Sequence, residues 1–85
     1  MRKVVIESPL SAETEIEREQ NRQYARACCR EALLVYKEAP FASHLLYDQP
    51  GLLNDTIPEE RELGITAGLE YVSEADATVV YTDLA

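Results

Sequence analysis

Three short apolar runs alternate with two longer segments of helical periodicity along the 85-residue chain. The apolar runs are partly β-branched and cover residues 3–6, 41–46 and 77–81. Strands that alternate with helices are typical of βαβ units, in which successive strands run parallel to one another. The pattern therefore predicts an α/β fold built on a three-stranded parallel sheet, with the element order βαβαβ.

The handedness of the connections between parallel strands determines on which face of the sheet each helix is expected to pack. Crossovers between parallel strands are almost always right-handed, and with the strand order 2-1-3 this places one helix on each face of the sheet. We therefore expect a Rossmann-like half that occupies residues 1–85 as a single domain. Both outer strands of such a sheet are open edges, which favours the pairing of two copies, so we also expect a homodimer.

The first helical segment follows Pro9 and has a recognisable start. Either Ser11 or Thr14 can cap the helix, and Thr14 and Glu17 have the spacing of a capping box, in which the two side chains satisfy backbone N–H groups at the helix end. Two adjacent cysteines within the helix cannot form an undistorted disulfide with each other, so we expect both to be reduced and without a metal. Small and apolar side chains recur at helical spacing and predict the buried face: Ala25, Cys28, Cys29, Ala32, Val35 and Tyr36.

The same helix carries arginines at four-residue intervals: Arg18, Arg22, Arg26 and Arg30. One interpretation is a stripe that binds phosphate or an acid. The other is a solvated face whose arginines pair with carboxylates from the acidic half of the chain or from a second subunit. We favour the second interpretation, because the stripe lacks interleaved aromatic residues and a glycine-rich loop. At helical range, Arg26 and Arg30 are expected to have no acidic neighbour.

The second helix is expected to begin at Pro58, since proline is tolerated in the first turn. Its buried face is predicted by an apolar stripe of Ile65, Leu69 and Val72. Gly64 and Gly68 lie one turn apart beside this stripe. Each glycine disfavours a helix, so the pair indicates that another backbone passes close by, and strand one is the expected neighbour.

Charge is sorted unevenly along the chain, whose net charge is −8. Residues 1–37 carry seven Lys or Arg and six Asp or Glu, whereas residues 38–85 carry one Arg and ten Asp or Glu. The two parts therefore have net charges of +1 and −9. An acidic half repels nucleic acid and attracts basic protein surfaces, so we expect a basic protein or nucleoprotein partner and no direct contact with nucleic acid.

The hydropathy of the chain argues against a membrane-spanning protein. No apolar run approaches the roughly 18 residues that span a bilayer, and the N-terminus lacks the pattern of a signal peptide. We therefore expect a protein of the cytoplasm.

The candidate chemistry lies at the carboxyl ends of the expected strands, where open α/β sheets bind ligands. Glu7 and Ser8 follow the first strand, and Asp83 follows the third. His44, the only histidine, lies in the second run and is expected to be a structural hydrogen-bonding residue rather than a catalytic one. The chain has no phosphate-binding Walker loop and no dinucleotide-binding glycine fingerprint, so we expect no cofactor.

Residues 4–10 (VVIESPL), the helix start that follows them, and residues 75–83 (ADATVVYTD) resemble nucleoside 2-deoxyribosyltransferase-like proteins, a class that includes small phage-encoded relatives. The resemblance implies a nucleoside pocket lined by Glu7, Ser8, Pro9 and Asp83. The family carries its catalytic glutamate on a turn and helix after strand three, which would lie beyond Ala85. The resemblance therefore implies a shortened relative without that glutamate.

Two functions follow from these observations. We favour a non-catalytic, acidic, phage-type protein that binds and inhibits a basic, nucleic-acid-binding host-defence complex, as anti-CRISPR proteins do. Its contacting carboxylates would be Glu59, Glu60, Glu62, Glu70 and Glu74. The alternative is a nucleoside- or nucleotide-binding protein, or an enzyme that acts on N-glycosidic bonds, with a site formed by Glu7, Ser8, Pro9, His44 and Asp83.

Overall fold

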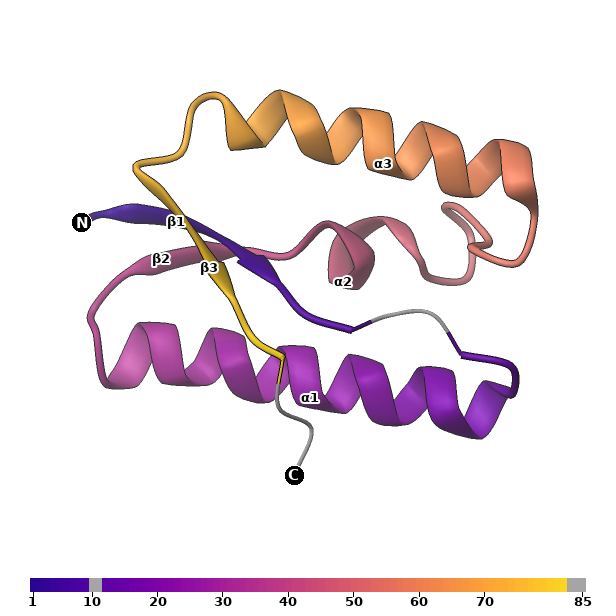
Figure 1. Cartoon of the computed structure of the whole chain (residues 1–85), viewed down its shortest axis with the longest axis horizontal. Coiled ribbons are helices and arrows are strands. Elements are labelled where there is room, and N and C mark those ends of the chain that lie inside the picture. Colours follow the sequence, from indigo (N-terminus) through magenta and orange to yellow (C-terminus); the bar gives the residue numbers. More distant parts are fainter. Residues whose placement is uncertain (10–11, 83–85) are drawn as a thin grey trace.

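The computed structural model describes residues 1–9 and 12–82 of the chain. It confirms the expected α/β fold: three parallel strands in the order β2-β1-β3, with α1 on one side of the sheet and α3 on the other (Figure 1). None of the helices in the described part of the chain is long and apolar enough to cross a membrane. The elements are β1 (Lys3–Glu7), α1 (Glu15–Leu34), β2 (Ala39–Phe41), α2 (Ser43–Tyr47), α3 (Pro58–Val72) and β3 (Ala77–Val80).

The central strand β1 supplies apolar side chains to both faces of the sheet. Val4 and Ile6 are buried in the same cluster as Cys28 and Ala32 of α1. Val5 is also buried and points to the opposite face, because successive side chains of a strand alternate. On that face its register partner Phe41 stacks on Tyr71 of α3, with ring centroids 4.4 Å apart. The central strand β1 is therefore covered by α1 on one face of the sheet and by α3 on the other.

Helix α1 begins and packs largely as its sequence predicts. The backbone N–H of Glu17 donates to Oγ1 of Thr14 at 3.1 Å, which confirms Thr14 as the cap, while Ser11 lies outside the described residues. Ala25, Cys28 and Ala32 are buried. The prediction was wrong for Val35 and Tyr36, which are exposed because the helix ends at Leu34 and the chain turns towards β2.

The second strand is shorter than predicted. β2 covers Ala39–Phe41, and residues 43–46, which were expected to extend it, belong to α2 (Ser43–Tyr47). A short apolar run fits a strand or a buried helical turn equally well, which is why periodicity alone misassigned it. His44 consequently lies on a helix, where it is buried.

Helix α3 begins at Pro58 as predicted, but the face it buries is not the predicted one. Ile65 and Leu69 are exposed, whereas Gly68 is the buried residue of this helix. A Cβ atom placed on Gly68 would lie 3.0 Å from Cβ of Ser43, so the close neighbour is α2 and not strand one. At Gly64 the nearest such atom is Cδ1 of Leu53, at 3.4 Å.

Alanine at these two glycines should change stability in opposite directions. Alanine favours a helix interior by about 1 kcal/mol over glycine. Gly64→Ala meets only the movable end of a leucine side chain, so its free energy of unfolding should rise by up to this amount. Gly68→Ala pushes against Ser43 on a packed helix, so its free energy of unfolding should fall. Urea unfolding of both variants measures the difference, and equal effects would contradict the packing of α3 on α2.

Candidate functional site

Ser8 and His44 meet beyond the end of β1. Ser8 Oγ lies 3.3 Å from Nε2 of His44, so the structure joins two of the residues that the sequence placed at the strand ends. His44 is only 8% exposed. Burial lowers the pKa of the imidazole, and nearby Arg22 lowers it further, while Asp48 opposes the shift. The ring is therefore neutral at neutral pH and serves as a hydrogen-bonding residue, as expected.

The remaining candidates from the sequence do not join this pair. Glu7 is exposed, and its backbone carbonyl accepts a hydrogen bond from the N–H of Tyr81 at 2.7 Å. Pro9 is half-buried, and neither residue lines the main hollow of the molecule. Asp83 lies outside the described residues, so the proposed carboxylate pair of Glu7 and Asp83 stays a prediction.

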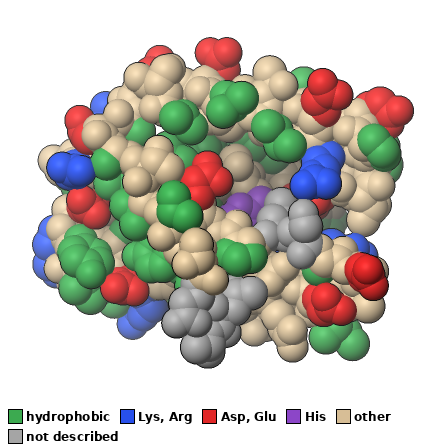
Figure 2. All heavy atoms as spheres, viewed as in Figure 1, with side chains coloured by type: hydrophobic (Ala, Val, Ile, Leu, Met, Phe, Trp, Pro, Cys, Tyr) green, Lys and Arg blue, Asp and Glu red, His purple; other side chains and the backbone are tan. Residues whose placement is uncertain are grey.

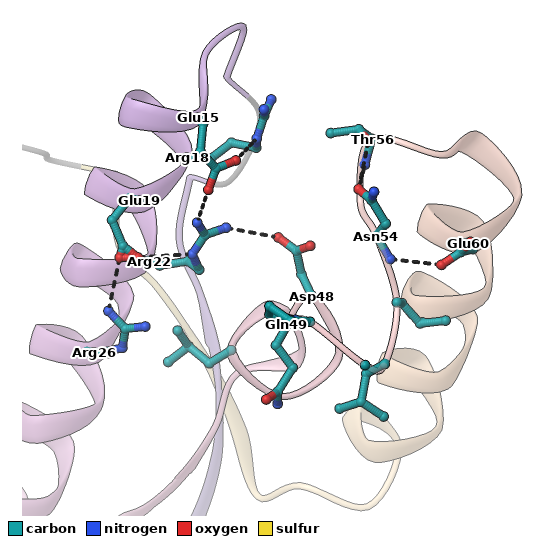
Figure 3. A pocket seen from close by; sticks show the side chains of 15 residues that line it. Glu15, Arg18, Glu19, Arg22, Arg26, Asp48, Gln49, Asn54, Thr56 and Glu60 are labelled. Atoms are coloured by element: carbon teal, nitrogen blue, oxygen red, sulfur yellow. Dashed lines mark hydrogen bonds and ion pairs between the residues drawn. The ribbon is translucent and has the colours of Figure 1, made fainter.

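The main hollow has a volume of about 720 Å³ and lies between the first half of α1 and the loop that joins α2 to α3. Arg18, Arg22 and Arg26 line it from the helix, while Asp48 and Asn54 line it from the loop (Figure 3). The strands point their carboxyl ends towards this part of the molecule (Figure 1). Ligands of open parallel sheets bind in this position.

Arg22 is the centre of an ion-pair cluster in this hollow. Its guanidinium donates to Glu15, to Glu19 at 3.2 Å and to Asp48 at 3.4 Å (Figure 3). The hydrogen bonds with Glu15 and then Glu19 raise the pKa of Arg22 against the opposing effect of burial, and hydrogen bonds from Arg22 and Arg18 lower the pKa of Glu15. The contact with Asp48 crosses from α1 to the loop, and both side chains are about 85% buried. Arg22 therefore ties the loop to the helix.

The loop is also braced by its own hydrogen bonds. Oδ1 of Asn54 accepts from the backbone N–H and the hydroxyl of Thr56, at 3.0 and 2.6 Å. The N–H of Asn54 donates to the carboxylate of Glu60 at 2.9 Å, and the N–H of Asp55 donates to Asp48 at 3.1 Å. Burial, together with the nearby charge of Asp48, raises the pKa of Asp55. Backbone groups of this irregular segment are thus satisfied without a helix or strand, which fixes one wall of the hollow.

The arginine stripe is partly what the sequence predicted. Arg22 pairs with Asp48 of the acidic half, which confirms the favoured interpretation for that residue. Arg26 has no acidic residue three or four positions away, as expected, but its guanidinium lies 3.5 Å from Glu19, seven residues earlier. Its side chain is 58% exposed, compared with 20% for Arg18 and 16% for Arg22. Arg26 is therefore the most exposed of the three arginines that line the hollow.

The candidate partner-binding carboxylates divide into two groups. Glu59, Glu62 and Glu70 are exposed on α3, and Glu74 is exposed just after it. Glu60 is half-buried and accepts the hydrogen bond from Asn54, so it supports the loop.

The described residues offer no clear place for a metal or a reactive thiol. Across residues 1–9 and 12–82, no group of three or more His, Cys, Asp or Glu side chains is arranged to hold a metal ion. Cys28 and Cys29 are free, and burial raises the pKa of both thiols. A protonated thiol is a poor nucleophile. Cys28 is buried in the core cluster, and the half-buried Cys29 packs against that cluster.

Sequence reasoning missed the loop as part of the site. Asp48, Gln49, Asn54 and Thr56 line the hollow, yet none of them was a candidate. The local signals were present: Pro50 and Gly51 indicate a turn, and Asn54 with Thr56 forms a short side-chain-to-backbone turn. The partnership of Asp48 with Arg22, which is 26 residues away, leaves no such local signal.

A family model described as "Domain of unknown function (DUF7768)" matches residues 2–85. No curated protein and no solved structure matches the chain.

The buried imidazole predicts how stability changes with pH. Since the pKa of His44 is lower in the folded state than its ordinary value of 6.5, the unfolded chain binds more protons just below that pH. The free energy of unfolding should therefore fall as the pH drops from about 7.5 to about 5.5. His44→Gln keeps a hydrogen-bonding side chain but removes the titration. Denaturant unfolding at several pH values should give a flatter profile for this variant, and an unchanged slope would contradict the assignment.

Proposed function

We infer that this chain, which belongs to the DUF7768 family of domains of unknown function, binds a nucleotide-sized anion in the hollow between α1 and the α2–α3 loop. The observation that carries this proposal is the placement of three arginines opposite a braced polar loop, beyond the carboxyl ends of a parallel sheet. Small-molecule sites occur at this position in open α/β folds.

The size and lining of the hollow suit a nucleotide. Its volume of about 720 Å³ lies within the roughly 300–1,000 Å³ that is common for small-molecule sites. Leu45 and Leu52 provide apolar surface for a flat base. The side-chain amide of Gln49 donates to the carbonyl of Leu46 at 2.7 Å, which leaves its own carbonyl oxygen as an acceptor for a base or sugar.

Arg26 is the residue we propose for the anionic group of the ligand. Arg22 is occupied by three carboxylates, so few of its donors are left. Among the described residues, Arg26 pairs only with Glu19, at 3.5 Å, and most of its side chain is exposed. A guanidinium presents a planar fork of donors that fits a phosphate in two-point contact. If a bound phosphate took the place of the Glu19 carboxylate beside Arg26, the guanidinium would still have a negatively charged partner.

The resemblance to nucleoside 2-deoxyribosyltransferase-like proteins supports a nucleoside as the rest of the ligand. It lies in residues 4–10 and 75–83, which flank the carboxyl ends of β1 and β3. We propose binding without catalysis. Ser8 and His44, the paired hydroxyl and imidazole beyond β1, do not line the hollow, so they would not act on a ligand held there.

A ligand panel tests the proposal. Nucleosides and their 5′-monophosphates, each added at about 100 times its dissociation constant, should raise the stability by about 2.7 kcal/mol, read as a thermal shift. Calorimetry of the best monophosphate should give about tenfold weaker binding for Arg26→Ala, since a hydrogen bond to a charged group contributes about 1.5–3 kcal/mol when made. The matching nucleoside should lose much less affinity.

Arg30→Ala is the matched control, because Arg30 lies one turn further along the same helix and does not line the hollow. It removes the same charge and should leave the affinity within about twofold, a difference below 0.5 kcal/mol. A panel without any stabilising member, or equal losses for the two arginines, would refute the assignment of this hollow as an anion site.

A further inference from the structure

Helix α3 carries its large apolar residues on the outside. Leu63, Ile65 and Leu69 are 58%, 53% and 60% exposed, whereas the inner side of the helix is formed by small residues such as Gly64 and Gly68. A surface helix normally turns its apolar residues to the core and its polar residues to water. Here three large aliphatic side chains lie on the outer face instead, and within the described residues no other element covers that face. Such a surface is typical of a protein–protein contact.

Negative charge runs along the same face. Glu59, Glu62 and Glu70 are exposed and follow each other at helical spacing over about 16 Å. Figure 2 shows acidic and hydrophobic side chains next to one another over this part of the molecule. Arg61 is the one basic residue of α3, and its guanidinium lies 3.9 Å from Asp55 of the preceding loop. The face therefore attracts cations along its whole length.

A smaller hollow adjoins this face at the start of the helix. It has a volume of about 260 Å³ and is lined by Pro58, Arg61, Glu62 and Ile65 of the helix, together with Asp55 and Thr56 of the preceding loop. This space accommodates one long side chain. Pro58 and Ile65 can pack against an aliphatic stem, and the Glu62 carboxylate can pair with a charged end, which together match lysine or arginine.

We propose that the outer face of α3, formed by Glu59, Glu62, Leu63, Ile65, Leu69 and Glu70, docks a basic amphipathic segment of another protein. The apolar side chains of that segment cover the three aliphatic residues, and its cations pair with the glutamates. Such segments occur on proteins that bind nucleic acid phosphates, so α3 competes with those phosphates for the same cations. A second copy of this chain is disfavoured as the occupant, because a symmetric contact would bring the acidic faces together.

The test uses a labelled synthetic helical peptide with leucines along one side and lysines and arginines flanking them. Its affinity is measured by fluorescence anisotropy with the whole chain at low and physiological salt. Glu59→Gln with Glu62→Gln should weaken binding about tenfold. The control pair, Glu13→Gln with Glu31→Gln, removes the same two charges from other exposed positions and should change the affinity less than about twofold.

The apolar contribution to binding is tested with a second pair of variants, one on the outer face of α3 and one control elsewhere. Leu69→Ser should weaken peptide binding about tenfold, because it removes apolar surface that the complex buries. Leu34→Ser exchanges a leucine of similar exposure at the end of α1 and should have little effect. All of these side chains are exposed, and circular dichroism checks that each variant keeps its helices.

Three results would overturn the proposal. If the peptide does not bind at low salt, the face does not take such a segment. If both glutamine pairs weaken binding equally, only the net charge of the molecule matters. If sedimentation shows a dimer that Leu69→Ser dissociates and Leu34→Ser does not, the face belongs to a second copy of the chain.

Discussion

The contact between Arg22 and Asp48 holds together the end of the molecule where a ligand would bind. Three carboxylates surround one guanidinium, and Asp48 alone among them comes from the loop rather than from α1. An exposed ion pair contributes little to stability. This pair is largely buried, so the loss of either partner leaves a charge with poor solvation. The wall of the hollow therefore depends on an interaction that is costly to break.

This dependence follows from the thinness of the apolar core. The buried side chains between α1 and the sheet are small or medium-sized, and Val4 is the largest fully buried one among the described residues. On the other face, α3 approaches α2 through Gly68, and Tyr71, which stacks on Phe41, is still 48% exposed. A domain of 85 residues with such a core has a small margin of stability. Because the apolar core is thin, polar contacts such as the ion pairs of Arg22 position the α2–α3 loop.

The sequence predicted the sheet well because its signals are local and the rules for joining strands are strict. The Rossmann-like strand order 2-1-3 is confirmed, and with that order the right-handed crossover rule correctly places α1 and α3 on opposite faces of the sheet. The same reasoning failed at residues 43–46, where a short apolar run forms a helix, and on α3, where Ile65 and Leu69 lie outside. In both places a contact distant in sequence decides the outcome. Ser43 touches Gly68, and the site itself rests on Arg22 meeting Asp48.

A double-mutant cycle of Arg22→Gln and Asp48→Asn, read by denaturant unfolding, tests the central claim most directly. If this contact fixes the loop against α1, the free energies of unfolding should be non-additive, with a coupling of about 1–3 kcal/mol between the two positions. Additivity within about 0.5 kcal/mol would mean that the two side chains do not depend on each other. In that case the wall of the hollow would not be held as described.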